Sequence, residues 1–456
     1  MTSRNTSDGT IIDALSNYMV EARRLDLPEG VALKAKHHIL DTIAAMVSGK
    51  TLKPGQVAVQ YAELLGGTPE AQVVGTSILT NAVNAALANG MMAHADESDD
   101  TMGSAVVPAA LALAEKYNAS GEAFLKAVTL GYDVSSRVER ALLPGGVSLQ
   151  ENPLGNFSRH SIRGVFGAAA AASAFTNLDP TRIRYVLSYA AQQASGITSS
   201  LSDLEHVEKA FHTGGMPARS GVAAVTMVEA GFTGVTDVVE GHNNFFDTFS
   251  GETNPGALIE ELGSRYEVMS NVIKKYCVGG PIQVPVDALV NIIARHRVGP
   301  DQLERIVVYT ATGENRLTGA QQTMPDINLR YLLAVTLLDG DLSFEACHDQ
   351  ARIQSPQVVD IIDRIDVQAD PMLVSTENPR QAVIEFITKD GQTYRDHVAV
   401  VRGAPESPMT TEEVVKKERG LLAMVLGDNK ADQVIAAVLN LESLDSVREL
   451  RPLLQG

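Results

Sequence analysis

The chain has 456 residues, of which 45% are hydrophobic and 20% are charged, a composition typical of a folded globular protein and not of a disordered, collagenous or disulfide-stapled one. The 37 basic and 55 acidic residues give a formal net charge of −18, which disfavours nonspecific binding to nucleic acid or to an anionic membrane. We therefore expect no nucleic acid and no membrane among its partners, although one local basic pocket would suffice for a small anion.

The cysteine content and the N-terminal residues indicate the compartment. Cys277 and Cys347 are the only two cysteines, and they lie in no CxxC or metal-ligand spacing. Residues 1–10 are polar and lack the apolar segment of a signal peptide. No apolar run reaches the roughly 18 residues of a membrane span. These features predict a cytoplasmic protein.

Apolar residues recur at helical spacing through the first part of the chain. Many of these segments are rich in Ala, Gly and Ser, whose small side chains let helices pack closely. Asp179 followed by Pro180 is typical of a helix start, with a capping carboxylate and a first-turn proline. The predicted helices cover residues 11–22, 31–47, 80–93, 107–116, 121–141, 164–175, 180–194 and 216–230.

The pattern changes after residue 270. Residues 302–310 alternate like a strand, and Asp390-Gly391 separates two further alternating runs, 382–389 and 392–402, as the turn of a β-hairpin does. Residues 329–338, 343–351 and most of 406–445 have helical patterns. The sequence therefore predicts a mainly α protein, with a large helical domain over 1–270 that is completed by 406–456, and a smaller α+β lid domain over 271–405.

A cluster of polar residues interrupts the helical pattern at residues 89–108. Carboxylates this close repel one another, and two that share a site push the pKa of one upward, which is one route to a general acid or base. A solvated acidic loop is the alternative, and a divalent metal fits the ligand types although the spacing matches no calcium loop. The cluster contains His94, Asp96, Glu97, Asp99, Asp100 and Thr101.

Two further clusters combine basic residues with helix starts. Arg159, His160 and Arg163 precede an Ala-rich helix, whose N-terminus favours an anion. Lys209 and His212 lie three residues apart, so one helical turn places them side by side just before a glycine pair. The alternatives are a packed histidine in the first cluster and a surface helix end in the second.

The fourth cluster, Lys274, Lys275 and Tyr276, precedes a Gly-Gly-Pro turn where the helical pattern ends, and a basic hinge is its alternative reading. No GxGxxG, GxSxG or HExxH motif is present, so the sequence indicates no organic cofactor. Carboxylates, imidazoles and cations together suit the removal of a proton next to a carboxylate, with the cations holding the enolate that forms.

Six motifs spread over much of the chain resemble the MmgE/PrpD family, which includes 2-methylcitrate dehydratase, cis-aconitate decarboxylase and iminodisuccinate epimerase. The resemblance implies a helical domain with a smaller α+β lid domain, a homodimer, a small carboxylic acid as substrate, and no organic cofactor or metal. The matching segments are residues 36–49, 89–101, 160–172, 209–221, 231–234 and 332–340.

The family's active-site residues carry over only in part. Thr101, His160 and Lys209 match its threonine, histidine and lysine, and Glu97 replaces the first Asp of its DFDDT motif. The segment after Thr101 is about six residues shorter than in the family and lacks a functional histidine. A second family histidine falls on Gln283.

We therefore expect a cofactor-independent lyase, of dehydratase or decarboxylase type, that abstracts a proton next to a carboxylate. The alternatives are a cofactor-independent epimerase or isomerase of a dicarboxylate such as iminodisuccinate, a non-catalytic binding paralogue, and a metal-dependent hydrolase. The predicted roles are a general base (His160, or Glu97 instead), carboxylate binding (Lys209 and Arg163), substrate orientation (Thr101 and Gln283), protonation (Tyr276), and further substrate contacts (His212, Lys275 and Asp96).

Overall fold

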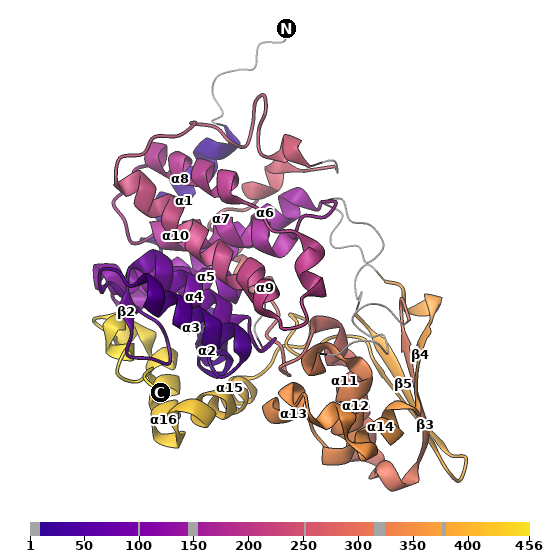
Figure 1. Cartoon of the computed structure of the whole chain (residues 1–456). Coiled ribbons are helices and arrows are strands. Elements are labelled where there is room, and N and C mark those ends of the chain that lie inside the picture. The colour runs from indigo at the N-terminus through magenta and orange to yellow at the C-terminus, as the bar shows by residue number, and fades with distance from the viewer. Residues whose placement is uncertain (1–9, 99–100, 145–153, 250–251, 314–323, 376–379) are drawn as a thin grey trace. The chain divides into compact units, whose positions relative to one another are not determined.

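The computed structural model describes residues 10–98, 101–144, 154–249, 252–313, 324–375 and 380–456 (Figure 1). The chain divides into two compact units. The first comprises Met1–Ala95, Asp99–Asn271 and Thr411–Gly456, and the second comprises Asp96–Ser98 and Val272–Thr410. The first unit is helical apart from a short two-stranded ribbon, and the second holds a four-stranded sheet with helices. The predicted class, mainly α with a smaller α+β part, is confirmed.

The first unit is built from helices that surround one small-residue helix. Its helices are α1 (Ile11–Ala22), α2 (Glu29–Gly49), α3 (Lys53–Leu65), α4 (Ala82–Ala93), α5 (Gly103–Tyr117), α6 (Gly121–Leu142), α7 (Arg159–Ser173), α8 (Pro180–Gln193), α9 (Val207–Ala210), α10 (Met216–Glu229), α15 (Thr411–Leu426) and α16 (Asp428–Leu439). The ribbon pairs β1 (Ala71–Gln72) with β2 (Leu79–Thr80). A π-helical turn, Phe211–Gly215, joins α9 to α10.

Helix α7 lies at the centre of this unit and packs against α5, α6 and α10 (Figure 1). Every residue of α7 from Ser161 to Ser173 is buried. A helix without a solvated face must be enclosed on all sides, and its alanine run allows the neighbouring backbones to approach closely. The C-terminal helices α15 and α16 also belong to this unit and pack against α2.

The predicted helices of the first unit are confirmed with shifted ends, and two helices, α3 and the four-residue α9, lie outside the predicted ranges. Asp179 caps α8 by accepting a hydrogen bond from the Arg182 N–H, as predicted. Helix α7 begins at Arg159, five residues before the predicted start, so His160 and Arg163 lie within its first turns. Helix α3 was not predicted, because Pro54 and Gly55 in its first turn weaken the helical pattern.

The second unit combines a mixed sheet with helices on one of its faces (Figure 1). The strand order is β4 (Ile365–Ala369), β3 (Leu303–Thr310), β5 (Ala382–Thr388) and β6 (Thr393–Val398), with β3 and β4 parallel and the other pairs antiparallel. Its helices are α11 (Gln283–His296), α12 (Leu329–Asp339), α13 (Phe344–His348) and α14 (Pro356–Ile362). Helix α11, which was not predicted, packs against β5 and β6.

The predicted β-hairpin is confirmed as β5 and β6. Gly391 adopts a φ of 85°, and its N–H donates to the Thr388 carbonyl at 2.9 Å, which closes the turn. Glycine populates this left-handed region at little cost, so the Asp-Gly pair was a reliable signal.

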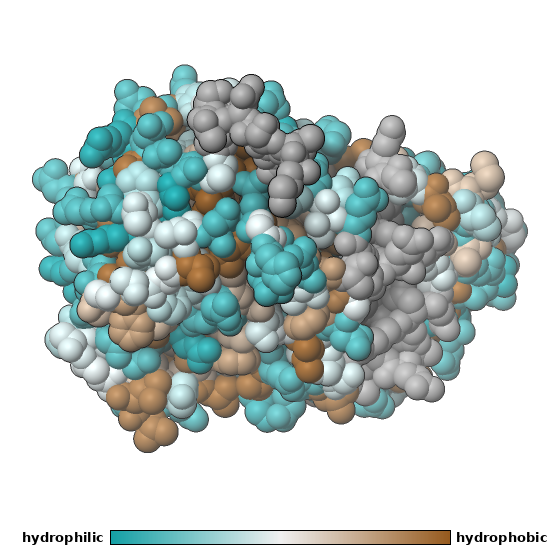
Figure 2. All heavy atoms as spheres, turned by 90° about the horizontal axis from the view of Figure 1, so that it is seen from above, coloured by the Kyte–Doolittle hydropathy of each residue, from teal (hydrophilic) through white to brown (hydrophobic). Residues whose placement is uncertain are grey.

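On the face drawn in Figure 2, hydrophilic residues predominate and hydrophobic ones are scattered among them, which is ordinary for a protein surface. Among the helices that the structure describes, none combines the length and the apolar character needed to span a bilayer.

Candidate active site

Three predicted site residues of the first unit come together where α7 begins. Arg163 Nη2 donates to Thr101 Oγ1 at 2.9 Å and lies 3.2 Å from His160 Nδ1. Thr101 Oγ1 is also 3.2 Å from His160 Nδ1. The three side chains thus form one closed triangle. Thr101 has a φ of 67°, a left-handed conformation that a β-branched residue rarely adopts, and such strain is concentrated at functional sites.

Glu139, which the sequence analysis did not single out, holds this triangle in place. The carboxylate extends from α6 and accepts a hydrogen bond from Arg159 Nη1 at 2.7 Å through one oxygen. Its other oxygen pairs with Arg163 Nη1. Burial alone would raise the pKa of Glu139, but Arg163 and Arg159 outweigh burial and the net direction is downward. Sequence gave no signal for this pairing, because Glu139 lies 24 positions from Arg163 on another helix.

His160 is held in its neutral form. Burial lowers the pKa of the imidazole well below its ordinary value of 6.5, and Arg159 and Arg163 lower it further, because a protonated ring beside two guanidinium groups is repelled. Among the described residues, Glu139 brings one negative charge against the two positive charges of Arg159 and Arg163, which leaves an excess of one positive charge. The cluster therefore suits an anionic ligand better than a cationic one.

The second predicted pair lies around the π-helical turn between α9 and α10. π-Helical turns are rare and often occur at functional sites. Lys209 is half-buried on α9, three residues before His212, which lies in the π turn. His212 is buried, and its Nδ1 is 2.9 Å from Ser200 Oγ while its Nε2 is 3.1 Å from Ser158 Oγ. Both ring nitrogens are thus engaged by serine hydroxyls, which does not support the predicted contact of His212 with substrate.

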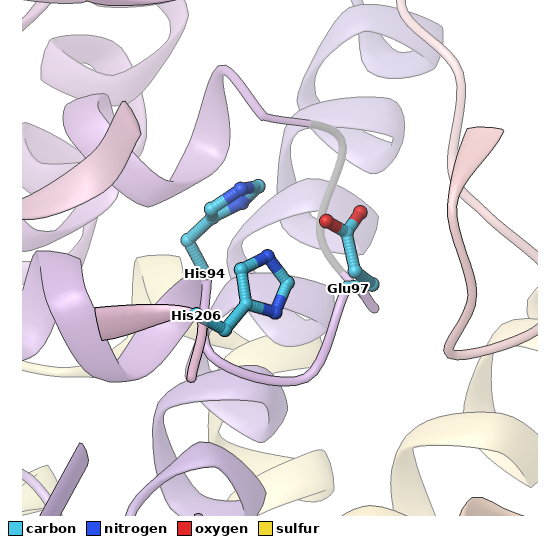
Figure 3. Close-up of side chains that lie close together, drawn as sticks. All are labelled: His94, Glu97 and His206. Carbon is cyan, nitrogen blue, oxygen red and sulfur yellow. The ribbon is translucent and has the colours of Figure 1, made fainter. Parts of the chain in front are cut away.

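Two buried histidines lie beside this segment. His94 follows α4, His206 precedes α9 with a φ of 63°, and their rings meet edge to face with centroids 5.9 Å apart (Figure 3). His206 was missed, although its place three residues before Lys209 was a usable signal. Glu97, also drawn in Figure 3, belongs to the second unit, where its carboxylate pairs with Lys274.

In the second unit, Glu97 is held by a lysine. Lys274 Nζ lies 3.0 Å from Glu97 Oε2 and donates to the Glu97 carbonyl at 2.7 Å, and both side chains are almost fully buried. Asp96 is also buried, and its Oδ1 accepts from the Ser98 N–H at 2.9 Å. Asp99 and Asp100 lie outside the described residues. The two described carboxylates of the acidic cluster, Asp96 and Glu97, are therefore buried and hydrogen-bonded and not solvated.

The remaining predicted residues of the second unit surround Asp287. Lys275 Nζ lies 2.7 Å from Asp287 Oδ1, and the Tyr276 hydroxyl donates to the same oxygen at 2.9 Å. Burial and the Asp287 charge raise the pKa of Tyr276 far above 10, so Tyr276 is a poor proton donor. The Gln283 amide donates to the carbonyls of Tyr276 and Val278 and accepts from the Tyr276 N–H. The polar atoms of Gln283 thus stabilise this loop, which does not support a role of Gln283 in orienting the substrate.

Removing Lys274 is expected to destabilise the protein strongly. Lys274→Met leaves the buried Glu97 carboxylate without its ammonium partner, and breaking a buried pair in this way costs about 3–5 kcal/mol. Urea unfolding of the single variant and of the double variant Lys274→Met/Glu97→Leu measures the effect. The double variant should recover much of the loss, because it buries no uncompensated charge. A single variant as stable as the wild type would contradict the pairing.

The buried His212 is expected to make the protein less stable in acid. Burial, with a smaller contribution from His94, lowers the pKa of His212 to about 4 from 6.5. Between these values the unfolded chain binds a proton that the folded chain does not, so the free energy of unfolding falls as the pH falls from 6.5 to 4, by about 3 kcal/mol. Above pH 6.5 this contribution to the pH dependence vanishes.

Urea unfolding of His212→Gln and of the wild type at pH 4.5, 5.5 and 7 tests this prediction. The variant should have the shallower pH dependence, although a part will remain because burial also lowers the pKa of His37 to about 4. His242→Gln, which changes an exposed ring, is the control and should keep the wild-type slope. Equal slopes for the wild type and His212→Gln would show that His212 is not the group responsible.

The fold and the cluster define a mainly helical protein of two units, with a buried, cation-rich polar site at the start of its central helix. Residues 13–257 match the MmgE/PrpD N-terminal domain, and residues 276–443 match the MmgE/PrpD C-terminal domain. The chain therefore belongs to the MmgE/PrpD family, as the motifs predicted, and it is a lyase-type enzyme of that family.

Similar curated proteins span nearly the whole chain. The chain is 26% identical over 447 residues to the cis-aconitate decarboxylase of Homo sapiens, covering 94% of this chain and 91% of the relative. It is 25% identical over 495 residues to a cis-aconitate decarboxylase-like protein of Aspergillus oryzae, covering 99% and 98%. The cis-aconitate decarboxylase of Aspergillus terreus is 24% identical over 467 residues, covering 94% and 92%.

Proposed function

We propose that this protein is a cofactor-independent lyase that decarboxylates or dehydrates a small di- or tricarboxylic acid, with cis-aconitate as the first candidate. The observation that carries the proposal is the cluster of Thr101, His160 and Arg163, beside which Arg159 and Arg163 bring two positive charges against the one negative charge of Glu139. A site with excess positive charge and oriented hydrogen-bond donors favours a substrate carboxylate. The names of the relatives support cis-aconitate.

The chemistry needs few groups. When a carboxylate leaves as carbon dioxide, its electron pair stays on carbon and a proton must be delivered to a carbon atom. In a dehydration, a proton leaves carbon and hydroxide leaves with a proton from an acid. In both cases the site must hold the remaining carboxylates, for which we propose Lys209, with Arg163 contributing its positive charge from within the cluster. It must also move protons, one to carbon in a decarboxylation, or one from carbon and one to the leaving hydroxide in a dehydration, and the first unit offers Lys209 and His160 for these transfers.

The second unit makes a smaller proposed contribution. Tyr276 and Gln283 are occupied by Asp287 and by the loop backbone, so we leave them out of the proton transfer. Glu97 and Asp96 remain candidates for orienting the substrate, and Lys275, which follows the Glu97 partner Lys274 in the sequence, is proposed as a further carboxylate contact. The absence of two family histidines, after Thr101 and at position 283, favours a substrate or a proton route that differs from those of the relatives.

The assembly and compartment also belong to the proposal. We propose a homodimer, on the strength of the family resemblance, and a reducing, cytoplasmic location. Cys277 and Cys347 are buried and form no disulfide, which supports a reducing compartment. Mass photometry of the purified protein decides the oligomeric state.

Proton NMR in D₂O with citrates, aconitates, tartrates and N-substituted aspartates tests the function, with Lys209→Ala as the background control. New alkene signals, or the loss of carbon dioxide from cis-aconitate, would support the lyase. Exchange of an α-proton for deuterium without a new product would contradict the lyase and support the epimerase. Thermal stabilisation by a ligand without exchange or turnover would identify a binding paralogue, because a bound ligand raises apparent stability by mass action.

A further inference from the structure

The hydrogen-bond partners of His160 determine which of its nitrogens carries the hydrogen. Arg163 Nη2 lies 2.9 Å from Thr101 Oγ1 and 3.2 Å from His160 Nδ1, and its two hydrogens can serve one acceptor each. A guanidinium group has donors and no acceptor. A hydrogen on Nδ1 would therefore face another donor, so Nδ1 must be the acceptor. In a neutral imidazole the hydrogen then lies on Nε2.

We propose that Arg163 holds His160 as the neutral imidazole with its hydrogen on Nε2, so that His160 serves the substrate as a hydrogen-bond donor and not as the general base. The tautomer follows from the contacts of the free protein, whereas the donor role rests on the proposed function. The ring is half-buried, and Nε2 has no hydrogen-bond partner among the residues that the structure describes. Nε2 is thus available to a carboxylate or enolate oxygen.

Glu139 is assigned as the positioning residue of this arrangement. It fixes Arg163 Nη1, and therefore the direction of Nη2, from the neighbouring helix α6. It also pairs with Arg159 Nη1 at 2.7 Å, so the carboxylate ties together two arginines that would otherwise repel. Arg159, His94 and His212 also act on His160, and all three oppose a charged ring.

A neutral donor at position 160 requires that another group in the proposed site carries the proton. A base at position 160 would need a free lone pair that faces the substrate, but the lone pair of Nδ1 faces Arg163. A neutral N–H donor can stabilise the negative charge that develops on oxygen, and the loss of one such donor typically costs about 10²–10³ in kcat. The proton carrier is then a different group, and Lys209 is the candidate that the first unit offers.

Nitrogen NMR of protein labelled with ¹⁵N-histidine tests the tautomer directly, with the His160 signals assigned by their loss in His160→Gln. We expect one acceptor-type nitrogen at Nδ1 and one N–H nitrogen at Nε2, unchanged between pH 8 and pH 5.5. In Arg163→Met, His160 should exchange between its two neutral tautomers, and its ring should become protonated as the pH falls. A hydrogen on Nδ1 in the wild type, a charged ring at pH 7, or an unchanged pattern in Arg163→Met would overturn the proposal.

Matched variants distinguish the loss of the contact between Arg163 and His160 from a general destabilisation of the protein. Arg184→Met removes an arginine–carboxylate pair with Asp13 in the same unit and should leave the His160 signals as in the wild type. Glu139→Gln should also increase the exchange between the two His160 tautomers, but to a smaller extent than Arg163→Met. If Arg163→Met does not fold, the tautomers measured in Glu139→Gln and in the wild type still test the proposal.

Turnover of cis-aconitate, if present, tests the donor role. His160→Gln keeps an N–H donor and is expected to lose about tenfold in kcat, whereas His160→Ala loses about 10²–10³. Equal losses in both variants would indicate a base. If no substrate is turned over, the proposed function fails, while the tautomer in the free protein stands or falls on the NMR measurement alone.

Discussion

Lys209→Ala is expected to reduce kcat/KM for cis-aconitate by a factor of about 10³ or more while leaving the fold intact. Lys209 supplies a half-buried cation immediately before the π turn, in the unit that holds His160 and Arg163. Removing one donor that stabilises developing charge costs about 10²–10³, and removing a proton carrier costs about 10²–10⁴. Steady-state kinetics measures the loss, and circular dichroism on heating checks the fold.

Lys53→Ala is the matched control for this result. Lys53 is also a lysine of the first unit, but it is exposed and pairs with Glu205 at the surface. Such surface pairs contribute about 0–1 kcal/mol, so both stability and turnover should stay close to those of the wild type. Wild-type turnover in Lys209→Ala, or an equal loss in Lys53→Ala, would remove Lys209 from the site.

Gly214→Ala is expected to lower the free energy of unfolding by about 3 kcal/mol and to reduce turnover. Gly214 lies in the π turn, which packs against α4, and a Cβ atom added there would lie 2.0 Å from the Gly90 carbonyl oxygen. The obstacle is backbone, which cannot rotate away as a side chain can. The π turn must then move away from α4 and take His212 with it. Urea unfolding and steady-state kinetics measure the two effects.

Gly420→Ala provides the control substitution. Gly420 lies in the interior of α15, and no atom lies within 4 Å of the position its Cβ would take. Alanine is better than glycine in a helix by about 0.5–1 kcal/mol, so this variant should be slightly more stable than the wild type and equally active. If Gly214→Ala were as stable as Gly420→Ala, the close approach of the π turn and α4 would be wrong.

The sequence alone determined the elements whose signals are local. The helix start at Asp179, the hairpin turn at Asp390-Gly391 and the small-residue helix that became α7 depend on residues a few positions apart, and all three are confirmed. The motifs around Thr101, His160 and Lys209 identified the family for the same reason. A residue type at a fixed spacing carries this information without any knowledge of distant contacts.

Tertiary structure alone decided the state of the site groups, because that state depends on contacts between residues far apart in the chain. Glu139 and Arg163 meet across two helices, and their contact gives Arg163 the orientation that faces His160. Gln283 and Tyr276 were plausible substrate ligands by type, but their polar atoms are occupied by the loop backbone and Asp287. Sequence supplied the chemical groups, whereas burial and partner geometry determined which of them can act on a substrate.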